Sequence, residues 1–248
     1  MTNKVDFIGI PLDNISMSET LEIIDHAVFS KKQIHHCVIN AGKFVKMQTD
    51  KDLMESVINS DIINADGMSI IWASRFLGCK IKERVAGIDL MENLVKLAYA
   101  KNYSCFFLGA EQKVVEKLVN NYSVMFSKKI IAGFRNGFFE EKDELKIVNE
   151  IKKSDANFLF VAITSPKKEI FLKKYKKDLQ NINLIMGVGG SFDVISGKVK
   201  RAPLFLQKTG FEWFYRLIQE PSRMWRRYII GNCQFIFLIL KAFFRRFY

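Results

Sequence analysis

Short apolar runs alternate with helical patterns along most of the chain. Four runs in its second half, SCFFLG, KIIAGF, NFLFVAI and NLIMGVG, are typical of buried strands, and residues 5–10, 36–39 and 61–64 predict three more. Ser16 and Glu19 have the spacing of a capping box at the start of a first helix. Further helices are expected over 43–57 (with a break near Asp50), 68–77, 90–99, 112–121, 142–153 and 167–179. This alternation predicts an α/β fold with a parallel sheet covered by helices.

Polar residues and glycines follow several of the predicted strands. In open parallel sheets, ligands bind beyond the carboxyl ends of the strands. We therefore expect a small-molecule site at that edge of the sheet. The residues placed there are Asn40, Asp66, Gly109, Gly133, Thr164 and Gly187.

The C-terminal segment differs from the rest in charge and in aromatic content. Residues 198–248 contain eleven Lys and Arg but only Glu212 and Glu220 as acids, which gives about +9 of the chain's net charge of +12. The longest apolar run, 228–244, is interrupted by polar residues, and its unbroken part, 235–240, is much shorter than the roughly 20 residues of a spanning helix. We expect a helix that lies in a membrane interface, and a core helix packed on the body is the alternative.

The charge shift and Gly197 predict a boundary between an α/β body, 1–196, and a basic helical appendage, 197–248. Four cysteines and three histidines show no zinc-ligand spacing, and the first residues show no signal peptide. These features predict a cytoplasmic protein that binds peripherally to the inner face of the plasma membrane through its appendage.

Two loops carry residues suited to chemistry. Asp66, in the sequence Asn-Ala-Asp-Gly between a strand and a helix, is either a helix N-cap or a carboxylate that takes a proton from a substrate hydroxyl. The glycine-rich turn 187–193 has amides that could cradle a phosphate or a sugar, although it matches neither a Walker loop nor G-x-G-x-x-G.

The arginines allow two interpretations. Arg84 reads by default as a surface residue, whereas Arg216, Arg223 and Arg227 could hold a diphosphate through paired hydrogen bonds or could form a face for solvent or lipid headgroups. The D-x-D sequence at 50–52 reads as the solvated start of a helix, so no metal is expected there.

Five blocks of sequence together resemble the WecG/TagA/CpsF glycosyltransferase family. They are N-A-x-K at 40–43, INADGMSIIWASRFLG, ERVAGIDLM, GVGGSFDVISGKVKRAP and GFEWFYRLIQEPSRMWRRY, in order over roughly residues 36 to 230. The resemblance implies a Rossmann-like sheet with helices on both faces. It also implies an inverting transfer, without metal or cofactor, of an N-acetylmannosamine-type sugar from a UDP-sugar donor to a polyprenyl-diphosphate-linked sugar.

The resemblance also implies roles for individual residues. Asp66 falls at the position of the family's proposed catalytic base. The positions of implied substrate contacts are Asn40, Arg84, Gly189, Gly190, Asp193, Arg216, Arg223 and Arg227.

This chain departs from the family pattern in two loops. The family often has G-x-P-x-Q-E after the penultimate strand, where this chain has Thr164 for the glycine and Lys168 for the glutamine. Lys168 is therefore a candidate contact to an acidic sugar or a phosphate, with a solvated helix residue as the alternative. The turn after Gly109 also lacks the family's extra glycines, so the exact donor stays open.

The function predicted is therefore a UDP-sugar-dependent glycosyltransferase of bacterial cell-surface polysaccharide or teichoic acid synthesis. A nucleic-acid-binding protein is a weaker alternative, because the basic residues lie beside too much apolar sequence for a solvated phosphate groove. A non-catalytic scaffold at a polysaccharide assembly site is the other. The sequence leaves the oligomeric state open, a homo-oligomer included.

Overall fold

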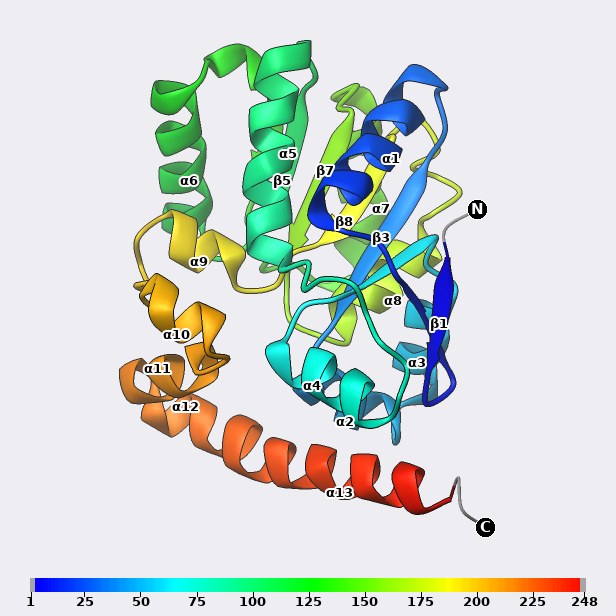
Figure 1. The fold of residues 1–248 in the computed structure, drawn as a ribbon. Coiled ribbons are helices and arrows are strands. Elements are labelled where there is room, and N and C mark those ends of the chain that lie inside the picture. Colours follow the sequence, from blue (N-terminus) through cyan, green and yellow to red (C-terminus); the bar gives the residue numbers. More distant parts are fainter. Residues whose placement is uncertain (1–2, 246–248) are drawn as a thin grey trace.

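The computed structural model describes residues 3–245, apart from the side chains of Arg223 and Arg227. Its centre is a six-stranded sheet, parallel throughout, in the order β4-β3-β8-β7-β5-β6 (Figure 1). The strands are β3 (Ile34–Ile39), β4 (Ile62–Ala65), β5 (Cys105–Gly109), β6 (Ile131–Arg135), β7 (Phe158–Ala162) and β8 (Leu184–Gly187). The predicted parallel α/β fold is confirmed.

Helices cover both faces of the sheet, because successive strand residues point to opposite sides. Phe107 packs in one apolar cluster and its neighbour Phe106 in another. The first face is covered by α1 (Met17–Phe29), α5 (Gly87–Lys101) and α6 (Gln112–Met125), and the second by α7 (Glu144–Lys153) and α8 (Lys167–Lys174). Two 3-10 turns, η1 (Lys128–Ile130) and η2 (Glu141–Asp143), precede β6 and α7.

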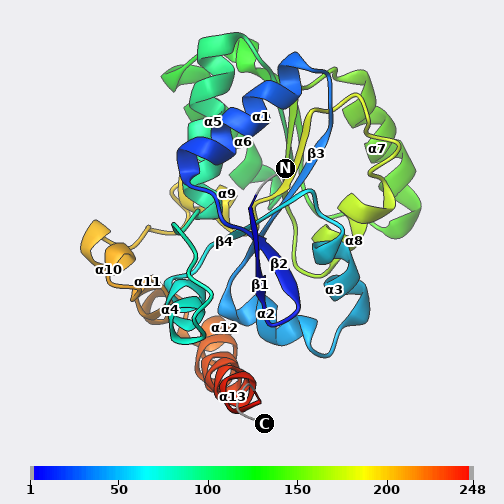
Figure 2. The ribbon, with the colours of Figure 1, turned by 45° about the vertical axis from the view of Figure 1, so that its right-hand side comes forward.

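A third cluster lies at the β3–β4 end of the sheet, where an N-terminal hairpin packs beside α2 and α3 (Figure 2). The helices of this cluster are α2 (Ala41–Met47), α3 (Lys51–Ile58) and α4 (Met68–Phe76). The hairpin consists of β1 (Lys4–Phe7) and β2 (Ile10–Asp13). The single strand predicted over 5–10 is therefore wrong: Ile8 and Gly9 have φ of 52° and 81° and reverse the chain.

Local capping explains where several helices begin. The Ser16–Glu19 capping box at the start of α1 is confirmed. Asp50 caps α3 by accepting a hydrogen bond from the Leu53 amide at 2.9 Å, which accounts for the break predicted near this residue. The D-x-D sequence is thus the start of a helix. The helix predicted over 167–179 is shorter, because α8 ends at Lys174.

The appendage, residues 197–248, follows the short helix α9 (Ser191–Ile195). Its described part forms α10 (Leu204–Lys208), α11 (Glu212–Gln219), α12 (Pro221–Trp225), a π-helical turn η3 (Arg226–Ile230) and α13 (Gly231–Phe244). Helix α13 runs across the end of the body beside α2 and α4 (Figure 1), and it buries Phe235 and Ile239 in the third cluster. None of the helices in the described range 3–245 has the length and apolarity needed to cross a membrane.

One face of α13 therefore packs on the body, as the core-helix alternative proposed. The ring centroid of Phe235 lies 5.6 Å from that of Phe44 in α2. The side chains of Ile236, Phe237 and Leu240, elsewhere around the same helix, are exposed. The division of the chain at residue 196 remains a prediction.

Two buried histidines in β3 should make stability depend on pH. Burial lowers the pKa of His35 and of His36 from 6.5 to about 4. As the pH falls from 6.5 to 4, the unfolded chain binds these protons before the folded chain does. We expect the free energy of unfolding, measured in urea, to decrease over this range by up to about 3 kcal/mol per histidine.

The variant His35→Leu should show a weaker pH dependence than the wild type. His26→Gln is the matched control, because His26 is exposed on α1. Equal pH dependence in all three proteins would contradict this interpretation.

Candidate active site

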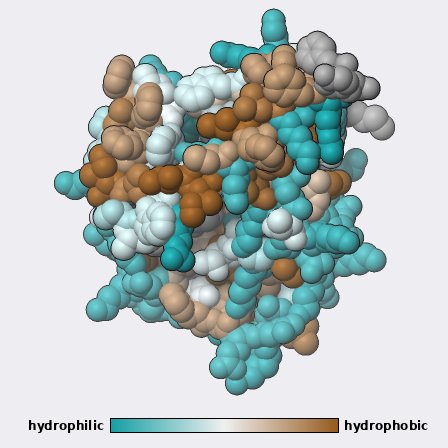
Figure 3. Space-filling model, turned by 90° about the horizontal axis from the view of Figure 1, so that it is seen from below, coloured by the Kyte–Doolittle hydropathy of each residue, from teal (hydrophilic) through white to brown (hydrophobic). Residues whose placement is uncertain are grey.

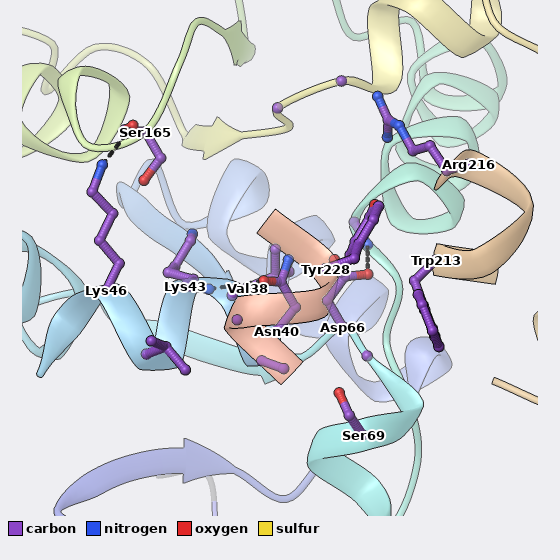
Figure 4. Close-up of a pocket in the computed structure, with 18 of the residues that line it drawn as sticks. Val38, Asn40, Lys43, Lys46, Asp66, Ser69, Ser165, Trp213, Arg216 and Tyr228 are labelled. Carbon is purple, nitrogen blue, oxygen red and sulfur yellow. Dashed lines mark hydrogen bonds between the residues drawn. The ribbon is translucent and has the colours of Figure 1, made fainter. Parts of the chain in front are cut away.

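A groove of about 2530 Å³ lies between the carboxyl edge of the sheet and the C-terminal helices. Its floor is formed by the loops after β3, β4, β7 and β8, and its other side by α11, η3 and α13. Figure 4 shows side chains from both sides turned toward the same space. The predicted site residues that line the groove are Asn40, Asp66, Arg84, Lys168, Gly189, Gly190, Asp193 and Arg216.

Asp66 is held in the floor by hydrogen bonds to its backbone and its carboxylate. Its amide donates to the Ile39 carbonyl at 2.9 Å, and its Oδ1 accepts from the amide of Gly87 at 3.1 Å. Gly87 is the first residue of α5, so the carboxylate lies at the positive end of that helix. The other oxygen, Oδ2, receives no hydrogen bond from any residue whose side chain is described.

The N-cap alternative for Asp66 is wrong for the helix that follows it. Helix α4 has Gly67 at its N-cap position, without a side-chain hydrogen bond. The Asp66 carboxylate instead bonds across to α5, and it keeps one oxygen for a ligand in the groove.

Arg84 joins the Asp66 loop to the appendage. Its Nε donates to the Asp66 carbonyl at 2.6 Å, its Nη1 to the Gln207 carbonyl at 3.2 Å, and its Nη2 to the Glu212 carboxylate at 2.8 Å. The default expectation of a solvated surface arginine is therefore wrong, since the side chain is largely buried and is bonded to both parts of the chain.

The glycine turn after β8 faces Arg216 from α11. A Cβ added to Gly190 would lie 2.7 Å from Nη2 of Arg216, so the guanidinium rests against the turn. Gly189 has φ of +54°, which favours glycine. Within residues 3–245, no acceptor is found for the amides of Gly189 and Gly190, which leaves them available to a ligand. Asp193 follows in α9, with a carboxylate oxygen 4.0 Å from the Lys198 ammonium.

Asn40 and Lys168 both have structural roles within the groove wall. Asn40 caps α2 by accepting a hydrogen bond from the Lys43 amide at 3.0 Å. Lys168 is 5% exposed and pairs with Glu169 at 2.9 Å, so the solvated alternative for Lys168 is wrong. Although burial raises the pKa of the Glu169 carboxyl, attraction to Lys43 and Lys168 outweighs it and holds that pKa below its usual range.

The groove becomes apolar toward α13. Trp72 and Phe76 of α4 line one side of this part, and Ile236, Phe237 and Leu240 of α13 line the other. Trp213 and Tyr228, with ring centroids 5.9 Å apart, also line the groove. One end of the groove is therefore charged, and the other end is apolar.

The remaining predicted positions are placed as follows. Thr164 and Gly187 line the groove, whereas Gly109 packs against the Ala162 backbone and does not line it. Gly133 lies within β6, against the ring of Phe106, so its expected place at a strand end is wrong. The side chains of Arg223 and Arg227 lie outside the described part of the structure.

Sequence reasoning missed several residues of the groove. Glu212 bonds Arg84, and its signal was that it is one of only two acids in a basic segment. Lys43 stood in a recognised block, but its ion pair with Glu169 joins α2 to α8, which are far apart in the sequence. Trp72, Trp213 and Tyr228 also stood in recognised blocks, but the sequence did not single them out from the other aromatic residues there.

The fold and the groove first define a class of protein. This is an α/β protein of parallel topology with a groove at the carboxyl edge of the sheet, where open sheets bind ligands, and the groove has a carboxylate at its floor and cations opposite. Residues 5–247 match the Glycosyl transferase WecG/TagA/CpsF family, and the chain belongs to that family. It is a glycosyltransferase, as the resemblance of the five sequence blocks implied.

Two relatives share most of their length with this chain. It is 36% identical over 188 residues to the N-acetylglucosaminyldiphosphoundecaprenol N-acetyl-beta-D-mannosaminyltransferase of Bacillus spizizenii, a match that covers 75% of this chain and 71% of the relative. It is 33% identical over 220 residues to the protein of the same name from Bacillus subtilis, covering 88% and 84%. Membership of a transferase family favours an enzyme over the scaffold or nucleic-acid alternatives.

A substitution at Gly210 tests how the appendage is held against the groove. Gly210 has φ of +73°, and a Cβ added there would lie 2.5 Å from the Trp72 ring. We expect Gly210→Ala to loosen this contact, at a cost on the order of 1–3 kcal/mol, and to speed trypsin cleavage at nearby Lys208. Gly231→Ala is the control, since a Cβ there meets nothing within 4 Å. Equal cleavage of both variants would contradict the packing described.

Proposed function

We propose that this enzyme transfers an N-acetylmannosamine-type sugar from a UDP-sugar donor to a polyprenyl-diphosphate-linked sugar, with inversion at the anomeric carbon. The names of the two relatives support the acceptor and the sugar class. The product would serve bacterial cell-surface polysaccharide or teichoic acid synthesis.

The observation that carries this proposal is the position of Asp66. One carboxylate oxygen is fixed by the Gly87 amide, and Asp66 lines the same groove as the glycine turn. A general base needs a fixed carboxylate within reach of the hydroxyl that it deprotonates. The apolar part of the groove, toward α13, suits the lipid portion of the acceptor.

The proposed reaction is a single displacement. Asp66 accepts the proton of the acceptor hydroxyl while that oxygen bonds to the anomeric carbon of the donor. The bond between the anomeric carbon and UDP breaks, and UDP leaves with the electron pair. Arg216 and the amides of Gly189 and Gly190 stabilise the charge that develops on the diphosphate.

Asn40, Asp193, Arg223 and Arg227 are assigned to substrate binding, whereas Arg84 is assigned to positioning because its Nε, Nη1 and Nη2 are bonded within the chain. Asn40 lies beside Asp66 in the floor (Figure 4), and we assign its side chain to binding the sugar. Asp193 is the last residue of the glycine-rich turn, and we assign it to binding the nucleotide of the donor. Arg84 positions the Asp66 loop, and Arg223 and Arg227 add positive charge for the diphosphate of the acceptor.

We further propose that the exposed face of α13 binds the inner surface of the plasma membrane. Figure 3, viewed from the side on which α13 lies in Figure 1, shows a hydrophobic band bordered by hydrophilic residues. Its exposed apolar members on η3 and α13 are Ile229, Ile230, Ile236, Phe237, Leu240 and Phe244. Exposed cations flank the band at Arg226, Lys241 and Arg245. Each contributes about 1 kcal/mol near an anionic leaflet.

The role of Asp66 is tested by Asp66→Asn. An amide cannot accept the proton, so we expect kcat to fall by about 10²–10⁴-fold while the thermal unfolding temperature stays close to that of the wild type. The matched control is Asp50→Asn, which changes an N-cap outside the groove and should keep its activity, since Asn caps helices as well as Asp. Unchanged turnover by Asp66→Asn would remove this residue from the mechanism.

The membrane surface is tested by the double variant Ile236→Glu with Phe237→Glu. Two charges on the exposed face should abolish sedimentation with vesicles that contain anionic lipid. Phe29→Glu is the control, because Phe29 is 86% exposed on α1, at a different face of the body, and should sediment like the wild type. Sedimentation of the double variant at the wild-type level would refute the docking role of α13.

A further inference from the structure

Two buried lysines line the floor of the groove and share one carboxylate. Lys43 is in the first turn of α2, and Lys168 is in the first turn of α8. Their Nζ atoms lie 2.8 and 2.9 Å from the same oxygen, Oε1 of Glu169. All three side chains are at most 8% exposed. Both lysines line the groove, whereas Glu169 does not.

This cluster carries an excess of positive charge. Two ammonium groups and one carboxylate give a net charge of +1, and among the described residues no second carboxylate lies within 4.0 Å of either ammonium. The other polar contact of Lys43 is the Sγ of Cys37 at 3.4 Å. A buried charge without a counterion is unfavourable, so the cluster is better balanced when an anion enters the groove. Burial and the charge of Lys43 lower the pKa of Lys168, whereas the pKa of Lys43 is raised, because its burial is outweighed by attraction to Cys37 and Glu169.

The cluster also lies where ligands of open sheets are expected. Strand β8 runs between β3 and β7, so Lys43 and Lys168 follow the two strands that flank it. The Lys168 stem rests against Gly187 at the end of β8, in space that a Cβ at this position would occupy. Lys168 thus reaches the start of the glycine turn, at the carboxyl end of β8. Ligands of open α/β sheets bind beyond these strand ends.

We propose that Lys43 and Lys168 form an anion subsite that binds a phosphate or carboxylate group of the sugar donor. The inference rests on the proposed function, which makes the groove a donor site. The anionic oxygens could belong to the nucleotide diphosphate or to a carboxylate on the transferred sugar, and both would bind by charge-assisted hydrogen bonds.

Titration calorimetry of the full chain with four ligands tests the subsite. The ligands are uridine, inorganic pyrophosphate, UDP-N-acetylmannosamine and UDP-N-acetylmannosaminuronic acid. We expect Lys168→Gln to weaken the binding of the anion that occupies the subsite by at least about 10-fold and to leave uridine unchanged. Lys173→Gln is the control, because Lys173 is also in α8 but pairs with Glu55 at the surface, 3.0 Å away. Lys168→Met, which keeps the apolar stem, replaces Lys168→Gln if that variant does not fold.

The ligands distinguish the two sources of the anion. Loss of affinity for pyrophosphate and both UDP-sugars assigns the subsite to the diphosphate, and loss for the uronic acid alone assigns it to a sugar carboxylate. Wild-type affinity of Lys168→Gln for all four ligands, or no binding of any anion to the wild type, would overturn the inference. If Lys168→Gln loses pyrophosphate binding but the wild type transfers no sugar from either donor, the subsite stands and the proposed function fails.

Discussion

The guanidinium of Arg84 connects the two parts of the chain that form the groove. It bonds the Asp66 carbonyl on one side and Gln207 and Glu212 on the other, at 2.6 to 3.2 Å. Hydrogen bonds to charged, largely buried groups are stronger than exposed ones. The three bonds of Arg84 therefore hold the Asp66 loop and the appendage together. Without it, the floor that holds Asp66 and the helices that carry Arg216 would have no polar link at this point.

The sheet supplies the second constraint, because its strands run parallel and end at one edge. Asn40, Asp66, Lys168 and the glycine turn are separated by up to 153 residues, yet each follows a neighbouring strand of the order β4-β3-β8-β7. Helix α13 then covers the third apolar cluster with one face and leaves the other exposed. The same helix thus supports the groove and presents the surface proposed to meet the membrane.

Features that depend on local patterns could be predicted from the sequence. The apolar runs gave the strands of the parallel sheet, and the Ser16–Glu19 spacing gave a true capping box. The turn at Ile8 and Gly9 was missed, because isoleucine is an unusual residue with positive φ.

Much of the candidate site depends on contacts between distant loops, which a single sequence does not reveal. The groove-lining residues at four strand ends were foreseen. The three acceptors of Arg84 and the ion pairs of Glu169 were not, because each links residues brought together only by the fold.

The account makes one central claim: sugar transfer takes place in the groove between the sheet edge and the appendage, with Asp66 as the base. A structure of the enzyme with an intact UDP-sugar tests it most directly. The account predicts that the anomeric carbon faces Asp66, with room for one hydroxyl oxygen within about 3 Å of both the carboxylate and that carbon. A donor bound with its sugar turned away from Asp66, or bound outside the groove, would contradict it.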